Sequence, residues 1–186
     1  HRRSHSFPTR RSSDLTTTAA SPCIIKYDTA GVVVWATTVP CDTAGANGFD
    51  AVSDASGIYV TGQYNSTASV SLLNGDGTSS GKTLPATAPS TSGFVIKYST
   101  TGAVLWVVSQ INANMTSIAI DASGIYVTGK YGAASPTILL NANGTLSTKT
   151  LAAFSVPFII KYDASGNVLW CSGTLASGSN SSLANG

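Results

Sequence analysis

Glutamate is absent from this 186-residue sequence, and histidine and arginine occur only within its first eleven residues. Catalytic side chains are most often histidine, glutamate, aspartate, cysteine or lysine with a shifted pKa. Two of these residue types are missing from residue 12 onward, and most of the aspartates fall in turn motifs. We therefore expect no enzyme activity, no catalytic residue and no cofactor.

Long apolar runs, clustered positive charge and metal-ligand spacings are lacking as well. Because no run of about 18 apolar residues occurs, the sequence encodes no transmembrane helix. Residues 16–186 contain six lysines and seven aspartates, a net charge of −1, and the lysines form no basic cluster. Without a basic patch we expect no nucleic-acid partner. Since the three cysteines do not have the spacing of a metal site, we expect no metal.

The cysteines leave the redox state open. Cys23 and Cys41 flank the open end of one expected hairpin, so a disulfide between them is conceivable. The expected register, however, places Cys23 opposite Ala36 and leaves Cys41 several residues too far along. Cys171 follows Trp170 in an expected strand, and we interpret it as a small buried residue.

The first residues differ from the rest in composition. Residues 5–15, HSFPTRRSSDL, resemble the in-frame translation of a common short-read sequencing adapter, and residues 1–11 hold every arginine and histidine. We interpret residues 1–15 as a non-native, disordered segment and exclude them from fold reasoning.

What the chain does contain is an internal repeat. The nonapeptide DASGIYVTG occurs at residues 54–62 and again, letter for letter, at 121–129. A second phrase, an apolar pair followed by Lys-Tyr and then by Trp, occurs three times, ending at Trp35, Trp106 and Trp170. An internal repeat of this kind indicates a fold built from repeated structural units, and we give it more weight than any local sequence pattern.

Each repeat predicts four antiparallel strands. In the middle copy these strands cover residues 49–54, 58–64, 94–98 and 103–110, and β-branched residues and glycine are frequent throughout. Tight turns with Asp or Ser first and Gly fourth join the first pair and the last pair, which predicts five bulged hairpins of one type. Since apolar residues occupy both sides of the strands, we expect burial on both faces. Gly62 and Gly129 should allow neighbouring backbones to approach closely.

Over residues 22–174 the chain resembles the SBBP repeat, a seven-bladed β-propeller repeat. The resemblance is carried by the pattern Phe-x-Ile-Lys-Tyr-x-x-x-Gly-x-x-x-Trp followed by Asp-Ala-Ser-Gly-x-Tyr-Val-Thr-Gly. The resemblance implies a propeller and a secreted or cell-surface location, and it brings no catalytic residue with it. The chain departs from the family in the inserts 65–93 and 132–157, which we expect to form small hairpins.

The expected organisation is all-β, a β-propeller fragment of about two and a half blades. We assign a half blade to 22–39, full blades to 48–110 and 115–174, and a tail to 175–186. Such a fragment cannot close into a ring, so further blades must come from the rest of its own chain.

Binding generally resides in loops on a rigid scaffold. In an up-and-down four-stranded blade, successive connections alternate between the two ends of the strands. The long inserts are therefore expected on the face of the propeller opposite the tight turns. We expect either a binding surface there or hairpins that only shield blade edges. The candidate binding residues are Asn74, Asp76, Lys82, Asn141, Asn143 and Lys149.

The leading function is a non-catalytic extracellular or surface-associated scaffold that recognises a protein or glycan ligand. The alternative is a propeller enzyme, quinoprotein-like or glycan-cleaving, whose active site lies on blades outside this sequence. An adhesin built from β-sandwich repeats is a third class, and it predicts Greek-key strand order instead.

Overall fold

The computed structural model describes residues 19–42 and 45–175, so the segment 1–15 and most of the tail 175–186 lie outside the described residues. The described chain consists of β-strands joined by turns, which confirms the predicted all-β class. No helix among the described residues is long and apolar enough to cross a membrane.

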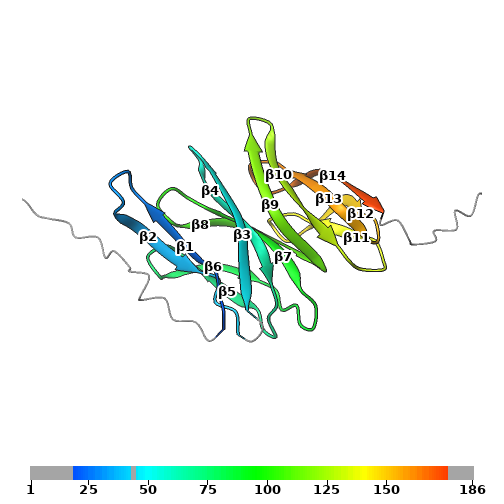
Figure 1. Cartoon of the computed structure of the whole chain (residues 1–186), viewed down its shortest axis with the longest axis horizontal. Helices are drawn as coiled ribbons and strands as arrows, with labels where there is room; N and C mark the ends of the chain where they lie inside the picture. The colour runs from blue at the N-terminus through cyan, green and yellow to red at the C-terminus, as the bar shows by residue number, and fades with distance from the viewer. Residues whose placement is uncertain (1–18, 43–44, 176–186) are drawn as a thin grey trace, which may run out of the picture.

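Three sheets lie side by side in chain order along the long axis of the molecule (Figure 1). The first is the pair β1–β2 (Cys23–Tyr27, Val33–Thr38). The second has the order β3-β4-β7-β8 (Ala46–Asp54, Gly57–Tyr64, Ser92–Tyr98, Val104–Ile111), and the third has the order β9-β10-β13-β14 (Ala113–Asp121, Gly124–Tyr131, Ser155–Tyr162, Val168–Leu175). The sequential strand order in both four-stranded sheets is the order predicted from the sequence.

The repeated inserts form hairpins, as predicted. Hairpin β5–β6 (Val70–Leu73, Ser79–Leu84) packs against β8, and hairpin β11–β12 (Thr137–Leu140, Leu146–Leu151) packs against β14. Each hairpin also touches the outer strand of the preceding sheet, since β5 contacts β2 and β11 contacts β8. The inserts therefore lie between successive sheets.

The tight turns are of two kinds, not the one predicted. Asp54 pairs directly with Gly57, which leaves a two-residue connection, and Gly57 has a φ angle of +154°. A Cβ at Gly57 would lie 2.2 Å from the carbonyl oxygen of Tyr98, so only glycine fits there. The turn between β7 and β8 is longer because Tyr98 pairs with Val104, and there Gly102 adopts the left-handed conformation at φ +92°.

The register of the first hairpin differs from the prediction by two residues. Cys23 lies opposite Thr38 instead of Ala36. The loop 28–32 is longer than a two-residue turn, and a bulge beside Tyr27 shifts the pairing by one more residue. The physical cause is therefore loop length together with the bulge, neither of which the residue pattern reveals.

The core forms two clusters, one between the first and second sheets and the other between the second and third sheets. Strand β7 is buried along its whole length, as the apolar pattern predicts. The expectation of two buried faces fails in β8 at Leu105, which is exposed although Trp106 beside it is buried. Leu105 is the extra residue of a bulge between the Lys97–Trp106 and Tyr98–Val104 pairs, whereas Val107 is half-buried and Ser109 is buried.

The predicted close approach at the strand glycines is confirmed. A Cβ built on Gly62 would lie 2.1 Å from the carbonyl oxygen of Asn47, and one on Gly129 would lie 1.9 Å from that of Asn114. Both glycines lie beside a bulge, since the pairing register shifts at the neighbouring strand in each sheet. Glycine at these positions lets the bulged strand lie close to its partner.

Candidate functional site

A tryptophan joins the first sheet to the second. Trp35 on β2 is buried, and its Nε1 donates to the carbonyl oxygen of Thr100 in the turn between β7 and β8 (3.3 Å). Its indole lies on Gly102 of the same turn, where a Cβ would stand 3.0 Å from the ring, and its ring centroid is 5.6 Å from that of Tyr98.

The same arrangement joins the second sheet to the third. Trp106 on β8 is buried, and its Nε1 donates to the carbonyl oxygen of Ala164 in the turn between β13 and β14 (3.1 Å). Its ring lies on Gly166, where a Cβ would stand 3.2 Å away. We call this contact, an indole seated on the turn of the next sheet, the tryptophan joint.

Each tryptophan of the four-stranded sheets belongs to a row of three side chains across one sheet face. In the second sheet, Lys97 lies opposite both Tyr59 and Trp106, and its Nζ stands 4.9 Å from the Tyr59 ring centroid. Lys161 makes the same contact with Tyr126 in the third sheet, also at 4.9 Å. A cation over an aromatic face is stabilising, so these repeated lysines have a structural role within their sheets.

Asp50 makes a second contact between the four-stranded sheets. Its Oδ2 accepts hydrogen bonds from Ser117 Oγ (2.7 Å) and from the backbone N–H of Ile118 (3.0 Å), both on β9. The bond from Ile118, followed by the bond from Ser117, lowers the pKa of Asp50, although partial burial opposes the shift. Sequence reasoning missed this residue because it lies within a strand and outside the turn motif.

Because of Asp50, the free energy of unfolding of the chain should decrease at acid pH. Because the pKa of Asp50 is lower in the folded state, its contribution is present above the unfolded pKa of about 3.9 and is lost as pH falls through the folded pKa. We expect Asp50→Asn to cost about 1 kcal/mol at pH 7, since solvent screens this half-buried group. Urea unfolding at pH 7 and pH 3 measures this: the variant should lose less stability on acidification than the natural chain. Equal losses would contradict the role of Asp50.

The tip of hairpin β5–β6 lies beside the tight turn that follows β7. Asn74 Oδ1 accepts the backbone N–H of Val104 (2.9 Å), and the N–H of Gly75 donates to the carbonyl oxygen of Gly102 (2.8 Å). The predicted position of Asn74 and Asp76 on the opposite face is therefore wrong. The insert begins on that face, but its hairpin folds back along the sheet.

Asn141 and Asn143 repeat this arrangement in the third sheet. Asn141 Oδ1 accepts the backbone N–H of Val168 (2.9 Å), so this tip also lies beside a tight turn instead of on the predicted face. Asn143 Oδ1 accepts hydrogen bonds from the backbone N–H (3.0 Å) and the hydroxyl (2.7 Å) of Thr145. The oxygens of these side chains thus stabilise the hairpin tips.

One groove brings three of the six candidate residues together. It has a volume of about 420 Å³ and lies between hairpin β5–β6, β8 and the tip of hairpin β11–β12. Its lining includes Lys82, Asn141 and Asn143, with Val107 and Ser109 from β8. The other three candidates, Asn74, Asp76 and Lys149, do not line it.

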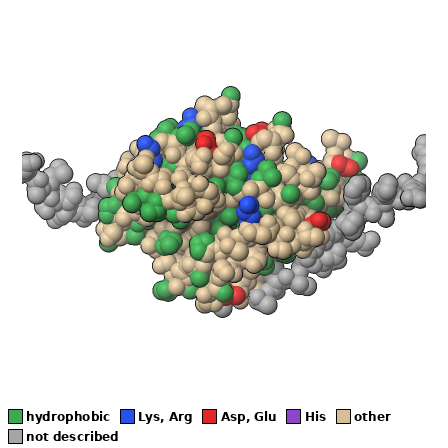
Figure 2. Space-filling model, turned by 180° about the vertical axis from the view of Figure 1, so that it is seen from behind, with side chains coloured by type: hydrophobic (Ala, Val, Ile, Leu, Met, Phe, Trp, Pro, Cys, Tyr) green, Lys and Arg blue, Asp and Glu red, His purple; other side chains and the backbone are tan. Residues whose placement is uncertain are grey.

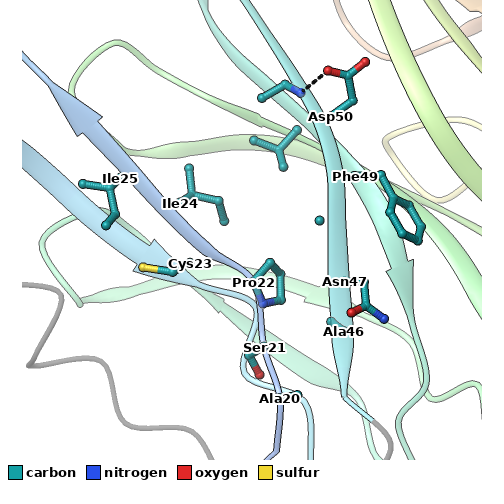
Figure 3. Close-up of a pocket in the computed structure, with 13 residues that line it drawn as sticks. Ala20, Ser21, Pro22, Cys23, Ile24, Ile25, Ala46, Asn47, Phe49 and Asp50 are labelled. Carbon is teal, nitrogen blue, oxygen red and sulfur yellow. Dashed lines mark hydrogen bonds between the residues drawn. The ribbon is translucent and has the colours of Figure 1, made fainter.

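A wider groove of about 700 Å³ separates β1 from β3 (Figure 3). Pro22 and Ile24 line one side and Asn47 and Asp50 line the other. Among the described residues β1 pairs with β2 alone, so its other edge borders this groove. In the two larger sheets, the strands equivalent to β1 have a partner on both edges.

The three cysteines are free thiols. Cys23 is exposed, and Cys41 is buried, which raises the pKa of its thiol to about 11 with a further contribution from the negative charge of Asp42. Cys171 is half-buried, more exposed than predicted, because it lies on the outermost strand of its sheet.

Charged side chains are few and scattered over the face shown in Figure 2. Within residues 19–42 and 45–175, no group of three or more His, Cys, Asp or Glu side chains is arranged to hold a metal ion.

No protein-family model matches the sequence, and no curated protein matches it. The resemblance to the propeller repeat therefore rests on the residues of the chain itself.

Proposed function

We propose that the three adjacent sheets are successive blades of a β-propeller. Strand order supports this proposal, because each four-stranded sheet is an up-and-down meander. The two tryptophan joints support it too, since the same contact links each sheet to the next. Propellers close with roughly four to eight blades, so we expect further blades from the rest of the natural chain.

The function that we propose for this propeller is a non-catalytic scaffold, secreted or on the cell surface, that recognises a ligand. The observation that carries the proposal is the groove containing Lys82, Asn141 and Asn143, formed where one insert hairpin meets the next. Residues that are separated by about sixty positions in the sequence come together there only because the two units are adjacent.

The groove offers hydrogen-bond donors beside a small apolar surface. Lys82 is exposed, and Asn143 uses its carbonyl oxygen within its own turn, which leaves its amide nitrogen able to donate to a ligand. Val107 supplies a half-buried apolar surface next to them. A ligand with carboxylate and hydroxyl acceptors fits this set, and an oligosaccharide that contains a uronic acid is the simplest example.

Binding of the full chain to an array of neutral and uronic-acid oligosaccharides tests the proposal. We expect binding to acidic members, weakened about tenfold by Lys82→Ala through the loss of one charge-assisted contact. Lys149→Ala is the matched control, because Lys149 occupies the corresponding position of the other hairpin but lies outside the groove.

The proposal fails if the array shows no binding, or if Lys82→Ala and Lys149→Ala weaken binding equally. Cleavage of a bound oligosaccharide would instead favour the alternative, a propeller enzyme.

A further inference from the structure

Asparagine followed by glycine occurs three times in the described part of the chain, at Asn47-Gly48, Asn74-Gly75 and Asn143-Gly144. This dipeptide is chemically labile, because the backbone nitrogen of the glycine can attack the side-chain carbonyl carbon of the asparagine, and glycine has no side chain to hinder the approach. The three dipeptides have different surroundings. Of the three asparagines, only Asn143 lines the groove that contains Lys82.

The first two dipeptides are held by the second sheet. Residues 47–48 lie in β3 and are paired with β4, so closure of a ring there would break the strand pairing. The N–H of Gly75 donates to the carbonyl oxygen of Gly102 (2.8 Å), and Asn74 Oδ1 accepts the N–H of Val104 (2.9 Å). Attack by the nitrogen of Gly75 therefore requires the hairpin tip to separate from the sheet.

The third dipeptide lies at the exposed tip of hairpin β11–β12. Asn143 and Gly144 are both exposed, and a Cβ at Gly144 would meet no atom within 4 Å. The N–H of Gly144 donates to the carbonyl oxygen of Asn141 in the same turn (3.0 Å), so opening of this one turn releases the nitrogen. Local opening of an exposed turn costs less free energy than detachment of a hairpin from a sheet. Asn143 is therefore the most reactive of the three asparagines.

The preceding hairpin shows that a carboxylate fits at this position and that a following unit leaves the position accessible. Asp76 is the equivalent of Asn143, and its Oδ1 accepts hydrogen bonds from the N–H (2.9 Å) and the hydroxyl (2.7 Å) of Thr78, as Asn143 Oδ1 does from Thr145. Asp76 is exposed although the third sheet follows its own. Conversion of Asn143 to aspartate therefore preserves the turn and adds a negative charge to the groove that Lys82 also lines.

We propose that Asn143 deamidates spontaneously and that the new carboxylate weakens the binding of acidic ligands in the groove, so that binding declines as the protein ages. The deamidation stands on the geometry of the hairpin tip alone. Its effect on binding rests on the function proposed above, because it concerns the same groove.

The reaction needs water and no other reactant. The nitrogen of Gly144 loses its proton to solvent and forms a bond with Cγ of Asn143, and the Cγ–Nδ2 bond breaks as Nδ2 takes up a proton and leaves as ammonia. Water then opens the resulting succinimide ring. Cleavage of the bond between the nitrogen and Cγ gives aspartate, and cleavage of the bond between the nitrogen and the backbone carbonyl carbon gives isoaspartate.

Incubation of the full chain in mildly alkaline buffer, followed by peptide mapping with mass spectrometry, measures deamidation at each dipeptide separately. We expect Asn143 to convert at least about tenfold faster than Asn74 and Asn47, because only Asn143 reacts after local opening of an exposed turn. Equal rates at the three asparagines, or no conversion at Asn143, would overturn the proposal.

Binding of fresh and incubated chain to uronic-acid oligosaccharides measures the effect on the groove. The deamidated chain should bind about tenfold more weakly, because its new carboxylate repels an acidic ligand, and Asn143→Asp should reproduce this loss without incubation. Asn47→Asp is the matched control, since it adds the same charge at an exposed position outside the groove. Asn143→Gln should show no decline on incubation, because its longer side chain closes the ring far more slowly.

The outcomes separate the two parts of the proposal from the proposed function. Deamidation without loss of binding, or an equal decline in Asn143→Gln, would overturn the regulatory role. If the fresh chain bound no acidic oligosaccharide, the proposed function and the regulatory role would fail together, and the peptide map would still decide the deamidation.

Discussion

Replacing Trp106 with alanine should lower the free energy of unfolding by about 3–5 kcal/mol, the cost of deleting a large buried aromatic side chain. The indole of Trp106 is buried between the second and third sheets and donates its Nε1–H to Ala164. Its removal leaves a cavity in the joint and an acceptor without its donor. Urea unfolding at low protein concentration, where copies do not associate, measures the loss.

Trp170→Ala is the control for this prediction, because Trp170 holds the same register position but is 40% exposed. We expect it to cost clearly less than Trp106→Ala in the monomer, since a partly exposed indole removes less apolar surface from water. Equal losses for Trp106→Ala and Trp170→Ala would show that the joint contributes nothing to stability.

Adding a single methyl group at Gly129 should destabilise the chain by about 3 kcal/mol, at the upper end of the cost of overpacking. The Cβ of Gly129→Ala would lie 1.9 Å from the carbonyl oxygen of Asn114 and 2.9 Å from the ring of Phe158. The first contact is with backbone, which cannot move without separating β9 from β10. Thermal or urea unfolding of the variant measures the effect.

Gly132→Ala provides the comparison, because a Cβ at Gly132 would meet no atom within 4 Å. That substitution should change stability by about 0.5 kcal/mol at most, since it mainly reduces the freedom of the unfolded chain. If Gly129→Ala proved as mild as Gly132→Ala, the close approach of the two strands would be wrong.

The sequence predicts the strands and their order well because local and repeated signals agree. The nonapeptide repeat locates the turns, and the Asp of each copy accepts hydrogen bonds within its own turn, as at Asp54 and Asp121. Apolar content and β-branched residues then locate the strands on either side. None of these signals requires knowledge of contacts between distant residues.

The sequence does not predict the pairing register of the strands, because the register depends on single extra residues in bulges. It also does not predict where the insert hairpins lie, because their position depends on packing. The bulge in β3 at Phe49 and the equivalent bulge in β9 at Thr116 have no marker in the residue pattern. Parity correctly predicts the end of the sheet at which each insert starts. It does not predict that the hairpin folds back, which follows from the hydrogen bonds of Asn74 and Asn141.

The candidate groove could be predicted only in part for the same reason. The position of Lys82 and Asn143 on the inserts can be read from the sequence, but their proximity depends on how one hairpin tip lies against the preceding sheet. Asp50 could not be identified at all, because its partners on β9 lie 67 and 68 positions away.

The tryptophan joint has a consequence for how such a repeat protein can gain units by gene duplication. Each joint uses residues of two adjoining units only, so the energetic coupling is between nearest neighbours, as in a linear array of repeats. A duplication of one gene segment that encodes a whole unit would supply both an indole and a turn, and it would extend the array without disturbing any existing contact. The identical nonapeptides of the two units are the sequence trace that such a recent duplication would leave.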